Sequence, residues 1–145
     1  MKISTKGRYA LRMLVDLAEH QSGGYTALKD IASRQGISKK YLEQIVPMLN
    51  KSGVLLTNRG SLGGYKLAKA PDQYTVGDIL RITEGSLAPV SCLEEGADPC
   101  DRSDTCATYA LWQGLDRVIS EYLDSVTLQD LLDQQRSLYA NNYSI

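Results

Sequence analysis

The chain has 145 residues, of which 43% are hydrophobic, enough for one domain or a small domain with an appendage. It has no apolar run near the roughly 20 residues that cross a bilayer and no apolar secretion signal, so we expect a cytoplasmic protein with no membrane partner. Its charge is divided: residues 1–70 carry 12 Lys and Arg against 4 Asp and Glu, a balance of +8, whereas residues 71–145 carry 4 against 13, a balance of −9. A basic half of this kind is typical of a protein that meets a polyanion.

The basic half predicts three helices. Apolar residues recur at helical spacing over residues 9–18, and Gly23 and Gly24 end this first helix. A second short helix covers about 27–35. A G-I-S turn follows, and its serine caps a third helix over about 38–50.

The second and third helices, joined by a turn that contains glycine, form the helix-turn-helix pattern. In this motif the start of the later helix meets base edges and phosphates, so Lys39 and Lys40 are expected to neutralise phosphates. Glu43 is more selective, because a carboxylate beside DNA is tolerated best where it accepts a hydrogen bond from cytosine N4; the alternative is a solvated helix residue. Pro47 costs the same helix one backbone hydrogen bond, so we expect a kink or a thinning there.

Two short strands are predicted after the third helix. Residues 54–58 and 65–68 read as a hairpin around a glycine-rich tip with Arg59 at its apex. Three glycines at the tip let the backbone approach another surface closely. Three helices followed by such a hairpin predict a winged helix whose Arg59 is directed at a DNA minor groove.

The acidic half predicts three further helices. Thr75 and Asp78 form a capping box that opens a short helix to about Thr83, and Thr127 caps a last short helix before a frayed tail. Between them, residues 107–125 form a long helix. A small winged helix has little surface to cover a long apolar face, so we expect a two-fold homodimer. The dimer would place its two reading helices, the third helix of each copy, about one DNA turn apart on a pseudo-palindromic operator. The apolar face comprises Ala110, Leu111, Leu115, Val118, Ile119, Tyr122 and Val126.

All three cysteines, Cys92, Cys100 and Cys106, lie in one segment with the spacing C-x7-C-x5-C and with five carboxylates around them. In a reducing compartment an odd count disfavours disulfides, and thiolates select zinc, copper(I) or iron–sulfur clusters. A cluster usually needs four protein ligands, and the sole histidine, His20, is remote, so the fourth would be a weaker neighbour or come from a second protomer. Spacing alone leaves open three unliganded loop cysteines. The neighbouring candidates are Asp98, Asp101, Asp104 and Tyr109.

Four stretches together carry a resemblance: M-K-I-S-T-K-G-R-Y-A, I-S-x-x-Y-L-E-Q, R-G-x-x-G-G-Y-x-L and C…C…C-x-x-x-A-L-W. Over nearly the whole length, the chain resembles the winged-helix regulators that include IscR, NsrR and CymR. The resemblance implies a repressor of iron–sulfur cluster biogenesis whose operator choice is switched by a labile cluster, 2Fe–2S by preference and 4Fe–4S as the alternative. It also implies that Cys92, Cys100 and Cys106 are ligands.

The chain departs from these relatives at the fourth ligand. The histidine of IscR-like members falls at Tyr109 here. Either Tyr109, Asp101, Asp104 or a residue of the second protomer replaces it, or the cluster differs in type. NsrR-like members take a carboxylate from the first helix, where this chain has Arg8. CymR-like members lack the cysteine set, and the A-L-W after Tyr109 favours the IscR side.

The predicted fold class is mainly α with a small β-hairpin wing. A winged helix-turn-helix domain is expected at 1–70, a connecting helix and cluster-binding loop at 71–105, and a dimerisation helix with a short C-terminal helix at 106–145. The alternatives are a nitric-oxide- or redox-sensing repressor with another cluster, and a zinc-stabilised DNA-binding or adaptor dimer. We expect no enzyme and no small-molecule substrate, because no Cys–His pair is evident. The contacts expected with double-stranded DNA are Lys6, Arg8, Ser38, Lys39, Lys40, Tyr41, Glu43, Gln44, Arg59 and Gly60.

Overall fold

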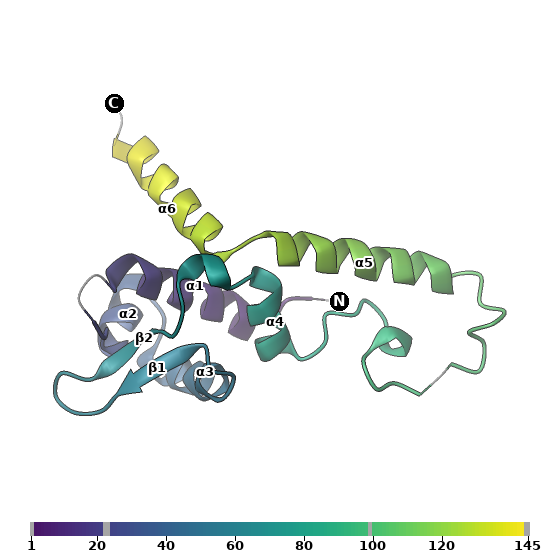
Figure 1. The fold of residues 1–145 in the computed structure, drawn as a ribbon, viewed down its shortest axis with the longest axis horizontal. Helices are drawn as coiled ribbons and strands as arrows, with labels where there is room; N and C mark the ends of the chain where they lie inside the picture. Colours follow the sequence, from purple (N-terminus) through teal and green to yellow (C-terminus); the bar gives the residue numbers. More distant parts are fainter. Residues whose placement is uncertain (1, 22–23, 99, 144–145) are drawn as a thin grey trace.

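The structure is a computed structural model that describes residues 2–21, 24–98 and 100–143. Within these residues the fold consists of six α-helices and one hairpin, which confirms the expected mainly α class with a small wing (Figure 1). Helix α5 extends away from the group formed by α1–α4 and the hairpin, and the segment between α4 and α5 runs out to its far end. The elements are α1 (Thr5–His20), α2 (Leu28–Gln35), α3 (Lys39–Lys51), β1 (Leu55–Asn58), β2 (Gly64–Leu67), α4 (Val76–Glu84), α5 (Tyr109–Ser125) and α6 (Leu128–Tyr143), with short 3-10 turns η1 (Pro71–Gln73) and η2 (Ser91–Leu93).

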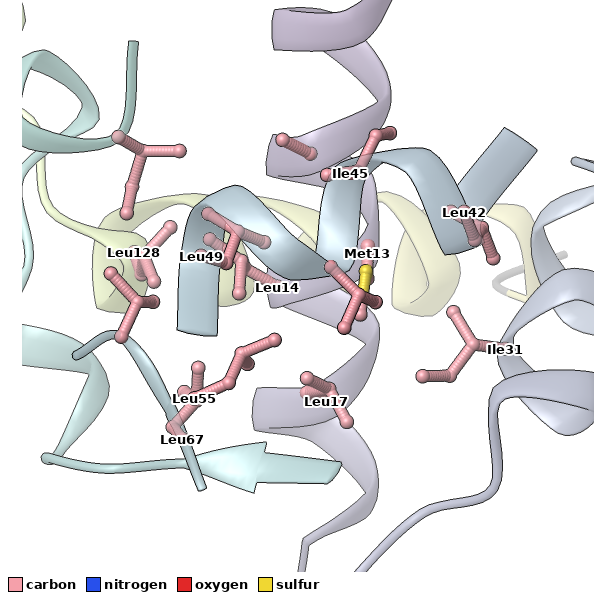
Figure 2. Close-up of a cluster of buried hydrophobic side chains, with 14 of the residues drawn as sticks. Met13, Leu14, Leu17, Ile31, Leu42, Ile45, Leu49, Leu55, Leu67 and Leu128 are labelled. Carbon is pink, nitrogen blue, oxygen red and sulfur yellow. The ribbon is translucent and has the colours of Figure 1, made fainter. Parts of the chain in front are cut away.

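The main core lies where α3 crosses α1 (Figure 2). Most of the apolar positions predicted from helical spacing are buried, and α3 remains helical through Pro47. Leu128 of α6 is also fully buried in this core, so the C-terminal helix completes the packing of the N-terminal part of the chain. Among the helices that the structure describes, none is both long and apolar enough to cross a bilayer. The fully buried side chains within the predicted helices are Ala10, Met13, Leu14, Leu17, Ile31, Leu42, Ile45, Leu49 and Ile79.

Helix α1 is longer than its apolar pattern predicts. It begins at Thr5 because the Ser4 hydroxyl accepts a hydrogen bond from Gly7 N at 3.3 Å, and Glu84 of α4 accepts bonds from Ser4 N and Oγ at 3.2 and 2.6 Å. Gly7 permits this close crossing, since a Cβ there would collide with the Glu84 carboxylate. The helix ends at His20, before the glycine pair that was expected to end it; Gly23 lies outside the described residues.

The hairpin is antiparallel, with Leu55 opposite Leu67 and Asn58 opposite Gly64. Its body is held by the loop before α2. Thr26 N donates to Tyr65 O at 2.8 Å, and Tyr65 N donates to Thr26 O at 2.9 Å. A Cβ at Gly64 would overlap the Thr26 carbonyl, so glycine is needed where the loop and the wing meet.

Both predicted threonine caps are confirmed. Thr75 Oγ1 accepts from Asp78 N at 3.0 Å, and Thr127 Oγ1 accepts from Asp130 N at 3.1 Å, with each aspartate bonded back to the threonine N–H. Thr75 and Thr127 also form an isolated antiparallel bridge, which joins the starts of α4 and α6.

The prediction of a short last helix and a frayed tail is wrong. Helix α6 has 16 residues and reaches Tyr143, while Ser144 and Ile145 lie outside the described residues. Leu128 and Leu132 are buried, and Arg136 Nε donates to Glu19 Oε2 of α1 at 3.0 Å. Packing against α1 therefore stabilises a helix whose polar sequence gives only a weak pattern.

Candidate functional site

The start of α3 is built to face an anion. The Ser38 side chain caps the helix by accepting from Tyr41 N at 3.1 Å, as predicted. Lys39 and Lys40 are exposed on the first turn, where the positive end of the helix dipole adds to their charge. This combination suits a DNA phosphate.

A groove of about 550 Å³ separates α3 from the wing. It brings Glu43 of α3 together with Arg59 and Gly60 of the hairpin, three residues predicted to contact DNA. Sequence reasoning missed Asn50 and Thr57, which also line the groove and are joined by a hydrogen bond from Thr57 Oγ1 to Asn50 Oδ1 at 3.0 Å. In the sequence, each of these two residues is only a polar residue that follows a leucine, which does not indicate a groove. The complete lining is Glu43, Val46, Pro47, Asn50, Thr57, Asn58, Arg59, Gly60, Gly63, Gly64 and Tyr65.

Glu43 keeps its carboxylate largely in solvent. Lys39 Nζ lies 3.9 Å from Glu43 Oε1, and the two side chains are 59% and 55% exposed. An exposed pair one helical turn apart contributes only about 0.3–0.5 kcal/mol, so it does not hold the carboxylate away from an approaching base. Gln44 is exposed beside it on the same helix.

Tyr41 anchors the reading helix to α1. Its ring meets the Tyr9 ring edge-on at 5.4 Å between centroids, and the Arg12 guanidinium lies 5.3 Å from the centre of the Tyr9 ring. The other two predicted contacts precede Tyr9 on α1, with Lys6 half-buried and Arg8 exposed.

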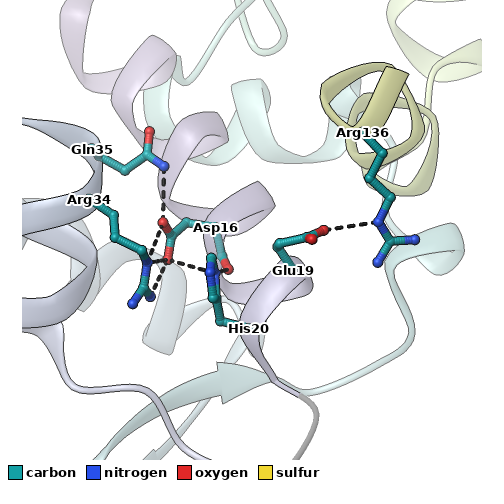
Figure 3. A network of polar contacts seen from close by, with 6 residues as sticks. All are labelled: Asp16, Glu19, His20, Arg34, Gln35 and Arg136. Atoms are coloured by element: carbon teal, nitrogen blue, oxygen red, sulfur yellow. Dashed lines mark hydrogen bonds and ion pairs between the residues drawn. The ribbon is translucent and has the colours of Figure 1, made fainter. Parts of the chain in front are cut away.

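A buried carboxylate fixes α2 against α1 (Figure 3). Asp16 is 1% exposed and accepts bonds from Arg34 Nε and Nη2 at 3.0 and 2.6 Å, and from Gln35 Nε2 at 3.0 Å. The hydrogen bond to Asp16 raises the pKa of Arg34. His20 Nδ1 lies 2.9 Å from the Asp16 backbone oxygen, so the sole histidine caps the end of α1.

The three cysteines are free thiols in the segment between α4 and α5. Cys92 lies in η2 and is half-buried, Cys100 is exposed, and Cys106 is half-buried. Within residues 2–21, 24–98 and 100–143, no three His, Cys, Asp or Glu side chains are gathered as a metal site would require. The predicted ligands therefore share a segment but do not converge in this conformation.

The surroundings of Cys106 favour the thiolate form of its side chain. Hydrogen bonds from the Thr108 hydroxyl, 3.3 Å from Sγ, and from the backbone N–H groups of Thr108 and Tyr109 lower the pKa of the Cys106 thiol. Tyr109 is half-buried as the first residue of α5, and Asp98, Asp101 and Asp104 are exposed. Three accessible thiols are donors of the kind that iron–sulfur clusters use, so the chemistry fits, but the segment must change its path to bring them together.

The apolar face predicted on α5 is open to solvent. Leu111 and Val118 are each 59% exposed, Leu115 is 39% exposed and Tyr122 is 66% exposed. The C-terminal end of this helix is held against α4 by Arg81, whose Nη1 and Nη2 donate to Asp124 at 2.7 and 2.9 Å. A projecting helix is thus fixed at one end with its apolar face uncovered.

Relatives of known name share this sequence over almost its whole length. The CymR transcriptional regulator of Bacillus subtilis is 44% identical over 131 residues, 90% of this chain and 89% of the relative. The IscR transcriptional regulator of Erwinia tasmaniensis is 38% identical over 138 residues, 95% of this chain and 82% of the relative. Overall sequence identity is therefore not higher to this IscR than to CymR, although the cysteine set and the A-L-W stretch indicated an IscR-like protein.

Solved structures of CymR and IscR are also similar to this chain. A structure of Bacillus subtilis CymR, described as the global cysteine regulator, matches with a TM-score of 0.75 at 41% identity, over 92% of this chain and 98% of that one. A structure of IscR from T. potens matches with a TM-score of 0.73 at 38% identity, over 93% and 88%. Residues 3–134 match the family model Rrf2, described as an iron-dependent transcriptional regulator. This chain belongs to the Rrf2 family of transcriptional regulators.

Proposed function

We propose that this regulator is a DNA-binding homodimer that controls iron–sulfur cluster biogenesis, and that a cluster held by Cys92, Cys100 and Cys106 switches its operator choice. One observation carries the proposal: all three cysteines are free thiols on a single accessible segment between α4 and α5. When bound, the cluster would supply an iron- and oxidation-sensitive cross-link of that segment. A 2Fe–2S cluster is preferred and a 4Fe–4S cluster is the alternative.

DNA binding is supported by charge and shape together. Lys39 and Lys40 stand at the positive end of α3, and the groove beside this helix is closed by the wing that carries Arg59. Phosphate contacts would position the protein, and Glu43 would select among base edges. The basic balance of residues 1–70 adds long-range attraction to the duplex.

A homodimer is supported by the apolar face of α5. Leu111, Val118 and Tyr122 are more than half exposed on a helix that projects from the rest of the chain. A second copy supplies an identical face, and a two-fold axis would set the reading helices on the two halves of a pseudo-palindromic operator.

The segment is linked to the DNA-binding part through Glu84. This last residue of α4 stands immediately before the segment and accepts two hydrogen bonds from Ser4, which caps α1. A change in the path of the segment would therefore act on the start of α1, and through the Tyr9–Tyr41 contact on α3. Tyr109, Asp101, Asp104 and a residue of a second protomer remain the candidates for the fourth ligand.

A second candidate is a cysteine regulator that holds no cluster. The 44% identity to CymR favours it, because a structure of that protein is described as that of a global cysteine regulator. A nitric-oxide- or redox-sensing repressor with another cluster and a zinc-stabilised dimer complete the alternatives. Zinc and bare thiols leave the protein colourless, whereas a cluster absorbs visible light.

Anaerobic purification separates these candidates. We expect brown protein containing iron and acid-labile sulfide, and we expect Cys92→Ser, Cys100→Ser and Cys106→Ser each to remove the visible absorption. Tyr109→Phe tests the fourth ligand, because a phenolate ligand would be lost while the ring is kept. Colourless wild-type protein after anaerobic reconstitution with iron and sulfide would contradict the cluster and leave DNA binding to be tested separately.

A further inference from the structure

The tip of the wing is a closed turn. Gly63 N donates to Gly60 O at 3.0 Å, and a Cβ at Gly63 would collide with the Asn58 carbonyl and lie 2.8 Å from Gly60 O. Only glycine fits at this point, so the turn has a defined shape. It presents two residues to solvent, Ser61 and Leu62.

Leu62 is unusual for a turn residue. Of the large hydrophobic side chains that the structure describes, it has the largest exposed fraction, 89%, against 42% for Leu56 on β1 of the same hairpin. Its neighbours in the turn are Gly60, Ser61 and Gly63, none of which has an apolar side chain to cover it. The turn therefore holds a single apolar side chain out in water.

The surroundings of Leu62 indicate what covers it. Arg59, three residues before it, lines the groove that faces α3, so Leu62 lies farther out on the same wing. Residues 1–70, which include Arg59 and Leu62, have a formal net charge of +8. A wing placed beside a reading helix reaches the minor groove that adjoins the occupied major groove, and leucine is among the side chains that DNA-binding proteins insert there between base steps.

We propose that Leu62 enters the DNA minor groove as an apolar wedge that partly unstacks one base step, while Arg59 contacts the groove beside it. This inference rests on the proposed DNA-binding function. Pyrimidine–purine steps are the most easily unstacked, so Leu62 adds a preference for a TA or CA step at the flank of each half-site, where no side chain reads a base edge. The wing then contributes to specificity as well as to affinity.

The test uses the full-length protein and a duplex that the wild-type protein has selected from a random pool. Leu62→Ser is expected to bind that duplex about tenfold more weakly, the scale of losing one buried leucine contact. Permanganate is expected to oxidise unstacked thymines at the flanks in the wild-type complex and not in the Leu62→Ser complex. Leu56→Ser, an exposed leucine away from the tip, is the matched control and should bind like the wild type.

Salt dependence identifies the kind of contact. Leu62→Ser should leave the slope of log K against log salt unchanged, because no charge is lost, whereas Arg59→Ala should reduce its magnitude by about one if it removes one phosphate contact. Equal affinity and equal thymine reactivity for wild type and Leu62→Ser would overturn the inference. So would a change in the sedimentation of the free protein without a change in DNA affinity, which would assign the tip to a protein contact. Failure of the wild type to enrich any duplex would instead contradict DNA binding itself.

Discussion

Arg81 of α4 donates two hydrogen bonds to Asp124 of α5, at 2.7 and 2.9 Å. This bidentate pair lies at the C-terminal end of the long helix and joins it to the part of the chain that carries α1 and α3. Gly77 makes room for it, since a Cβ there would overlap the Asp124 carboxylate. The orientation of a helix proposed to form the dimer is thus set by two partly exposed side chains.

This pair predicts a dependence of stability on pH. The hydrogen bonds from Arg81 lower the pKa of Asp124 below its ordinary value of 3.8. Because the folded pKa lies below the unfolded one, the stabilisation is fully present above about pH 4 and is lost as the pH falls through the folded pKa. Asp124→Asn should therefore lower the free energy of unfolding in urea by up to about 1 kcal/mol at pH 7, and by less below pH 4.

The control for this experiment is Asp72→Asn, which changes an exposed carboxylate on η1. It should leave the pH profile of the wild type unchanged. A constant difference between Asp124→Asn and wild type across the whole pH range would show that the ion pair is not the cause.

Asp16 gives a larger stability prediction. Arg34→Met removes the guanidinium that donates to it at 2.6 and 3.0 Å and leaves a carboxylate that is 1% exposed without its cation. The expected loss in the free energy of unfolding is about 3 kcal/mol, measured by urea denaturation. Arg136→Met breaks an exposed Arg–Glu pair and should cost less than about 1 kcal/mol. Similar losses in the two variants would disprove the special role of the buried carboxylate.

Much of this architecture was predictable because local chemistry specifies it. Ser38, Thr75 and Thr127 are caps whose side-chain bonds depend on residues only three positions away. The apolar spacing of α1 and α3 likewise requires only helical geometry. Long-range contacts were not predictable: Glu84 extends α1 by bonding to Ser4 across 80 positions, and the core holds Leu128 and thereby orders α6.

The candidate site also contains residues that local sequence predicts and residues that only the tertiary structure reveals. Lys39, Lys40 and Arg59 follow from a motif, and the structure places Glu43 and Arg59 on one groove. Asn50 and Thr57 became visible only when α3 and β1 were set side by side. The cysteines show the opposite case, since their spacing suggests a site and the described chain does not gather one.

Glu43 tests base reading. Glu43→Ala should broaden operator choice, with a change of about 1–3 kcal/mol in binding at one base position, because a carboxylate accepts from cytosine N4 and repels other contexts. Binding to a set of single-base operator variants measures it by fluorescence anisotropy. Gln44→Ala, which removes another expected DNA contact on the same helix but no charge, shows whether the change in preference belongs to the carboxylate. An unchanged profile for Glu43→Ala would return this residue to the solvated surface of α3.

The open face of α5 predicts the oligomeric state. Val118→Glu places a charge at a position that is 59% exposed in the single chain and would be buried between two copies. Analytical ultracentrifugation should show a dimer for the wild type and a monomer for this variant, with an unchanged circular dichroism spectrum. Leu56→Glu alters an exposed leucine on the wing and should remain dimeric. A dimeric Val118→Glu protein would place the interface elsewhere.

The most direct test of the central proposal compares the operators chosen by two forms of one protein. Duplexes are selected anaerobically from a random pool by the cluster-loaded wild type and, in parallel, by the Cys92→Ser, Cys100→Ser, Cys106→Ser triple variant. We predict two different sequence preferences, with both proteins folded and dimeric. The same preference at the same affinity would contradict the proposal that these cysteines govern which DNA the regulator binds.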